Sequence, residues 1–171
     1  MRPDMQVSSP RGWPYTVGSS PEPLPSSAWV QSLRLMHPLS TDVLPSGDNI
    51  SAADLLSWVG KHSVMLEEGE SGILEEWLIE NDMTPISERR LVLVVGELGS
   101  PYRITDLGIS GIPIIPVRID GVARTWTDTM DSREVQPGVH HITLARTKGW
   151  WERTLLALPD IDQLRKMTTW L

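Results

Sequence analysis

The chain has 171 residues with a net charge of −7, and 40% of them are hydrophobic, which favours one globular domain with an appendage. It contains no cysteine, and this excludes disulfides, zinc–thiolate sites and thiol nucleophiles. The first residues lack the apolar core of a secretory signal, and no apolar run is long enough to span a membrane. We therefore expect a cytoplasmic protein or a virion component.

Residues 1–47 are predicted to be an extended arm. They contain eight of the 14 prolines, and each proline removes a hydrogen-bond donor and favours extended geometry in the residue before it. A short strand or helical turn within 28–36 is compatible with this pattern. Trp13, Tyr15 and Trp29 are large anchors that a plain linker does not need, so we expect them to contact a partner.

Two helices are expected between residues 48 and 82. Ser51 and Asp54 have the spacing of a capping box at the start of a 51–60 helix. A second helix begins near residue 70 or 71, and we expect Trp77 to be buried on its apolar side. A single helical turn is expected after Pro85.

The whole charge excess lies in this helical middle. Residues 48–90 carry ten acidic and three basic groups, whereas the segments on either side are neutral. An acidic face repels phosphate, so we expect no nucleic-acid binding through the helices. Such a face is explained by a solvated, solubilising surface or by a basic protein partner.

The second half of the chain is predicted to be mainly strands. The apolar run 91–95 favours a central strand. Asp120-Gly121 and Lys148-Gly149 each separate two extended runs, which predicts two hairpins. Residues 159–171 are predicted to be a helix that begins at a proline and carries acidic residues in its first turn.

The predicted fold class is therefore α+β: a mainly antiparallel sheet of about five strands, with two preceding helices, one C-terminal helix and an extended N-terminal arm. The expected domain organisation is an arm over 1–47 and one domain over 48–171.

One candidate ligand pocket follows the apolar run 91–95. A glycine-rich turn can present backbone N–H groups to an anion, although this one lacks the lysine and spacing of a phosphate-binding loop and no clear helix is expected after it. A simple strand-ending turn explains the same residues. The residues of this alternative pocket are Gly96, Glu97, Gly99, Ser100 and Arg103.

No metal site, cofactor or catalytic constellation is expected. His140 and His141 are adjacent in a predicted strand, so their side chains point to opposite faces and cannot share a metal in regular geometry. The same rule applies to Trp150 and Trp151, one of which must lie on the outer face of the sheet. An exposed tryptophan at that position would indicate a partner surface.

From residue 92 onward the chain loosely resembles the γ-glutamylcyclotransferase-like family. The segment VVGELGSPYR resembles its strand and glycine loop, VRIDGVARTW resembles its hairpin, and WERTLLALPDIDQL resembles the strand, Leu-Pro pair and helix that follow. The resemblance implies a substrate cradle at the glycine loop. The chain departs from the family pattern at its end, where residues 164–171 contain no counterpart of the family's catalytic glutamate. The resemblance therefore implies a degenerate enzyme.

The leading functional expectation is a non-enzymatic structural subunit of a larger assembly, such as a phage head–tail connector or a capsid accessory protein, with a homo-oligomeric state and no membrane partner. Its N-terminal arm would dock on neighbouring subunits. The alternatives are the cyclotransferase-like enzyme and an acidic protein-binding module. The residues expected to contact partners are Trp13, Tyr15, Trp29, Trp150 and Trp151.

Overall fold

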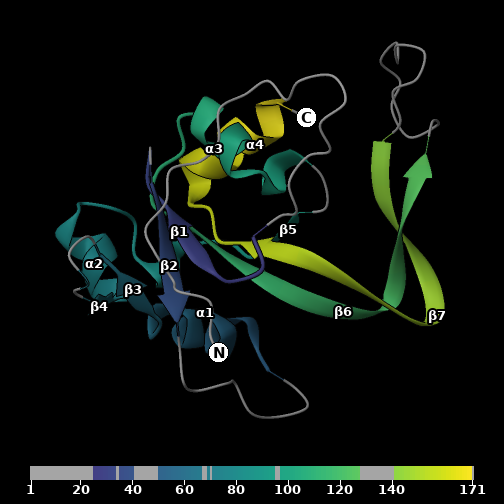
Figure 1. Ribbon diagram of the computed structural model, residues 1–171, viewed down its shortest axis with the longest axis horizontal. Coiled ribbons are helices and arrows are strands. Elements are labelled where there is room, and N and C mark those ends of the chain that lie inside the picture. Colours follow the sequence, from purple (N-terminus) through teal and green to yellow (C-terminus); the bar gives the residue numbers. More distant parts are fainter. Residues whose placement is uncertain are drawn as a thin grey trace.

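A computed structural model describes residues 25–33, 35–40, 50–66, 69, 71–94, 97–127 and 141–170. In this part of the chain the fold is α+β, with one antiparallel sheet of seven strands in the order β4-β3-β2-β1-β6-β7-β5 (Figure 1). The strands are β1 (Trp29–Gln31), β2 (Met36–Ser40), β3 (Ser63–Met65), β4 (Ser71–Ile73), β5 (Val92–Val94), β6 (Ile112–Thr127) and β7 (His141–Ala157).

Four α-helices and two short 3₁₀ helices accompany the sheet. They are α1 (Ala52–Gly60), α2 (Leu74–Glu80), α3 (Pro101–Asp106), α4 (Ile161–Trp170), η2 (Ile86–Glu88) and η3 (Glu97–Gly99). As expected from the sequence, α1 begins with a capping box: the Asp54 amide donates to the Ser51 hydroxyl oxygen, and the Ser51 amide donates to the Asp54 carboxylate.

The centre of the sheet is buried on both faces. Neighbouring residues of one strand belong to different core clusters, because side chains alternate across a strand. Ile115 and Leu156 pack with α1, α2 and η2, whereas Ile114 and Leu155 pack with α3 and α4. The result is a three-layer arrangement in which helices cover both faces of the central strands (Figure 1).

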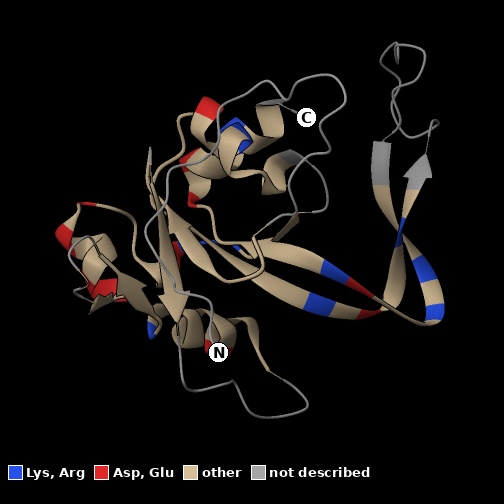
Figure 2. Ribbon diagram, in the orientation of Figure 1, with Lys and Arg blue, Asp and Glu red and all other residues tan. Residues whose placement is uncertain are grey.

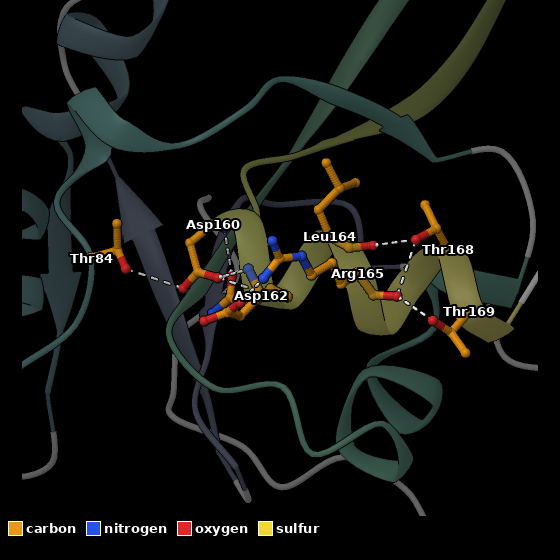
Figure 3. Close-up of polar contacts among 8 residues, drawn as sticks. Thr84, Asp160, Asp162, Leu164, Arg165, Thr168 and Thr169 are labelled. Carbon is orange, nitrogen blue, oxygen red and sulfur yellow. Dashed lines mark hydrogen bonds and ion pairs between the residues drawn. The ribbon is translucent and has the colours of Figure 1, made fainter.

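Hydrogen bonds at the start of α4 connect this helix to the segment before η2. Asp160 accepts hydrogen bonds from the amides of Asp162 and Gln163, and the Gln163 side chain accepts one from the Asp160 amide, which forms a second capping box. The Thr84 hydroxyl donates to the other Asp160 oxygen at 3.2 Å (Figure 3). This confirms the C-terminal helix, which begins at Ile161, and it makes Asp160 the N-cap residue before the helix instead of a residue of its first turn.

The described part of the predicted arm belongs to the sheet. β1 pairs with β6 and β2, and β2 pairs with β3, so residues 29–40 join the two halves of the fold. The boundary at residue 47 is therefore not a boundary of folded structure.

Two prolines lie inside strands although proline lacks a backbone donor. Pro38 is a paired residue of β2, and Pro113 is a paired residue of β6.

Three strand predictions need correction. Residues 92–94 form an edge strand that pairs with β7, not a central strand. Neither Asp120-Gly121 nor Lys148-Gly149 is a hairpin turn, because both lie inside the single long pair β6–β7. The register shifts there: Asp120 pairs with Trp151, but Val122 pairs with Arg146.

Two glycines explain that error. Gly121 has a φ of 80° and Gly149 a φ of 77°, and this left-handed geometry suits a bulge as well as a tight turn. The two Xaa-Gly pairs lie opposite each other, so they form a bulge within one pair of strands instead of the turns of two separate hairpins. Residues 128–140, between the two strands, lie outside the described residues.

Candidate docking surfaces

The pair β6–β7 continues far beyond the body of the protein. Its inner end, residues 112–116 and 154–157, is flanked by β1 and β5. Beyond it, residues 117–127 and 141–153 pair only with each other among the described strands, and we call this part the outer ribbon. Figure 1 shows it leaving the body on the side away from α2.

The outer ribbon exposes two adjacent tryptophans. Trp150 is 58% and Trp151 51% exposed. The sequence placed one of them on an outer face, but both are exposed because no described element covers either side chain. The Arg118 guanidinium lies 4.8 Å from the ring centre of Trp151, a cation–π distance, whereas Trp150 makes no such contact in the described structure.

The described outer ribbon is basic, in contrast to the rest of the chain. It carries five basic and two acidic groups, and Figure 2 shows its blue segments opposite the red ones of α2. Arg118 pairs with Asp120, and Arg124 pairs with Glu152. Within the part of the chain that the structure describes, Arg146 and Lys148 form no ion pair, so the surplus positive charge lies beside Trp150.

A second surface feature lies at the other end of the molecule. A pocket of about 450 Å³ opens between α1, the start of α2 and η2. Its apolar lining includes Ala53, Leu56 and Ile73, and Ile73 is 44% exposed. Two carboxylates, Glu75 and Glu76, also line it. We call this the α1–α2 pocket.

The wall of the α1–α2 pocket is formed by Gly60 and Glu75. A β-carbon at Gly60 would lie 3.5 Å from the Glu75 carboxylate, which is an ordinary van der Waals contact, so α1 and α2 pack side by side here without requiring glycine. That carboxylate accepts a hydrogen bond from the Ile86 amide at 2.8 Å and so links α2 to η2. The sequence did not predict this pocket, because its lining comes from segments that only the fold brings together.

Arg89 is a buried cation near this region, and its role is structural. It is 1% exposed and donates to the carbonyls of Thr84 and Leu158 and to the Gln163 side chain. Burial lowers its pKa to about 10, although Asp160 and Glu75 oppose that shift. Arg89 therefore joins the segment after η2 to the end of β7 and the start of α4.

His62 follows α1 and is also buried. Its Nδ1 lies 3.0 Å from the Val59 carbonyl and 3.2 Å from that of Trp58, so Nδ1–H is the donor. Burial lowers the pKa of His62, and the two backbone hydrogen bonds work against that shift. Among the described residues no group of three or more metal-ligating side chains is found, which agrees with the isolation of this histidine.

The other predicted site residues are scattered. Trp29 is 2% exposed, with its indole N–H donating to the Gln31 side chain, so its proposed contact with a partner is wrong. Trp13 and Tyr15 lie outside the described residues. Trp77 is buried as predicted, in the core cluster that contains Val59.

The glycine-rich turn does not form an open loop where it is described. Leu98 and Gly99 are buried, and Ser100 precedes α3, a short helix that the sequence did not predict. Arg103 lies on that helix, 3.7 Å from Asp106. Gly96 and the side chain of Glu97 lie outside the description, so the alternative pocket stays a prediction.

The comparisons with known proteins give no assignment. No protein family, no curated protein and no solved structure matches this chain. Among the described residues, no helix combines the length and apolar character needed to cross a bilayer. Function must therefore be argued from the two surfaces described above.

Proposed function

We propose that this protein is a non-enzymatic structural subunit of a larger protein assembly, and that the outer ribbon is its main docking element. The observation that carries this proposal is the exposure of Trp150 and Trp151 on a ribbon that leaves the body. Tryptophan is enriched among the residues that dominate protein interfaces, because its large ring gains much when it is desolvated.

The architecture of the ribbon favours docking over a role in folding. A two-stranded hairpin is marginally stable by itself, and this one extends beyond the strands and helices that stabilise its base. Two large apolar side chains exposed on such an extension indicate a surface that contacts another molecule. Rings and shells, including phage connectors and capsids, are assemblies of the proposed class.

Residues 1–24, with Trp13 and Tyr15, are included in the proposal as a second docking segment. This part rests on the proline-rich sequence alone. Removal of residues 1–24 is expected to weaken assembly without lowering the melting temperature, whereas a lower melting temperature would assign the segment to the fold.

The test of this function uses the protein in its native cell extract. A photo-crosslinking amino acid at the exposed ribbon residue Ala145 is compared with one at Leu93, an exposed apolar residue on the edge strand β5. Trp150 is retained, because a substitution at position 150 would remove the docking side chain. We expect the chain to sediment as part of a large complex, with protein crosslinks concentrated on the ribbon. A monomeric chain in the extract, or equal crosslinking at both positions, would overturn the proposal.

A further inference from the structure

The outer ribbon and the α1–α2 pocket have complementary properties. The ribbon presents an exposed tryptophan beside two basic side chains that form no ion pair in the described structure, Arg146 and Lys148. The pocket presents an apolar hollow of about 450 Å³ with Glu75 and Glu76 in its lining. A cavity of this size lies within the range of sites that bury a small ligand or an aromatic side chain.

The charge of the two surfaces points to the same pairing. Residues 48–90, which build the pocket, carry ten acidic and three basic groups. The described outer ribbon carries five basic and two acidic groups, and the 128–140 segment beyond it adds three acidic groups and one basic group. Positive charge is therefore concentrated in the middle of the ribbon, around the bulge and Trp150. Opposite potentials of this kind steer association and fix its register.

One chain cannot make this contact with itself. The pocket lies between α1 and α2. The outer ribbon continues β6 and β7 and leaves the body on the side away from α2 (Figures 1 and 2). Both strands of the ribbon are anchored at their base by β1 and β5, and this anchoring directs the ribbon away from α2. The partner of each surface must be another molecule.

We infer that the α1–α2 pocket is the receptor for the outer ribbon of a second copy of this chain, with Trp150 inserted among Ala53, Leu56 and Ile73 and with Lys148 facing Glu76. This inference rests on the proposed assembly function and names its partner. Since one copy's ribbon meets another copy's pocket, the contact is head-to-tail, and it leaves a free ribbon and a free pocket at the ends of every open chain. Such contacts close into a ring or extend into a filament.

The pairing of Lys148 with Glu76 allows a charge-swap experiment on the purified full-length chain. Both side chains are exposed, so neither substitution should disturb the fold. Lys148→Glu and Glu76→Lys should each weaken self-association at least tenfold in sedimentation velocity over a range of protein concentrations. The double variant, and an equal mixture of the two single variants, should regain association, because each restores opposite charges across the contact.

Matched controls separate this contact from general effects of charge and exposure. Glu80→Lys changes the same charge on the same helix outside the pocket lining, and Leu93→Ala removes another exposed apolar side chain. Both should associate like the unmodified chain. Trp150→Ala should weaken association about 30-fold or more, as loss of a central aromatic anchor does.

Three outcomes would overturn the inference. The first is a purified chain that stays monomeric at every concentration; if the native extract still contains a large complex, the assembly function stands and its partner is a different protein. The second is self-association that the charge swap fails to restore. The third is association that is lost on deletion of residues 1–24 but unchanged by Trp150→Ala, which would make the N-terminal segment the occupant of the pocket.

Discussion

The inner and outer halves of the β6–β7 pair belong to one hairpin, but they differ in what surrounds them. In the inner half, residues such as Ile114 and Leu155 are buried because β1, β5 and helices on both faces cover them. In the outer half, Trp150 and Trp151 stay exposed because no described element covers these two side chains. The comparison shows that an apolar side chain on this pair of strands is buried only where a neighbouring element covers it.

The largest effect is expected for a tryptophan in the covered region. Trp29→Ala should lower the free energy of unfolding by about 3–5 kcal/mol, since it leaves a cavity between β1 and the α3–α4 layer. Urea denaturation with a fixed slope measures this loss. An unchanged midpoint would mean that the core does not depend on β1, as expected if residues 1–47 were an arm outside the domain.

The buried cation at the base of the hairpin comes next. Arg89→Met should destabilise the fold, because roughly 1–3 kcal/mol is lost for each of the Thr84 and Leu158 carbonyls left without a donor. Arg90→Met is the matched control, since Arg90 is exposed, and it should change stability by less than about 0.5 kcal/mol. A variant at position 89 that is more stable than the natural chain would show that desolvation of the guanidinium outweighs its hydrogen bonds.

The covered region should also depend on pH through His62. Its pKa in the fold lies below the ordinary value of 6.5, so the unfolded chain binds the proton more readily. The contribution of neutral His62 to the free energy of unfolding is complete above pH 6.5 and is lost as the pH falls below 6.5. His62→Gln should flatten the unfolding free energy between pH 6.5 and about pH 5, above the range where carboxylates titrate. An identical slope in both proteins would assign the pH dependence to other groups.

A smaller loss is expected at the start of α4. Asp160→Ala removes the acceptor for two helix amides and for the Thr84 hydroxyl, and it should cost about 0.5–2 kcal/mol in thermal denaturation. Asp162→Ala removes only an exposed pair with Arg165 and should cost less (Figure 3). Equal losses would mean that α4 is stabilised by its first-turn charge and not by the cap.

The smallest effects are expected on the outer ribbon. At protein concentrations too low for association, Trp150→Ala should change stability by less than about 0.5 kcal/mol, because the side chain is mostly exposed. Trp151→Ala should cost slightly more, since it loses the contact with Arg118, worth about 0.5–1 kcal/mol at exposed sites. A loss at position 150 as large as that expected for Trp29 would show that the ribbon folds back onto a core, and the comparison would fail.

The amino-acid sequence by itself determined the local features of this protein. Ser51 and Asp54 are close in sequence, so their capping box follows from spacing alone. The C-terminal helix was also predicted from local residues, although it begins at Ile161 and not at Pro159. The burial of Trp77 followed from helical periodicity. The exposure of one tryptophan at position 150 or 151 followed from strand alternation.

Only the tertiary structure decided which strands pair and which surfaces stay open. A positive φ at Gly121 and Gly149 is a local property that fits a hairpin turn and a bulge equally, and the choice depends on partner strands far away in the sequence. β1 and β2 lie in a proline-rich segment that local sequence predicts to be an extended arm. They are strands of the sheet because they pair with β6 and β3, which lie far away in the sequence. The α1–α2 pocket likewise joins residues from four elements, and only their packing brings Gly60, Glu75 and Ile86 together.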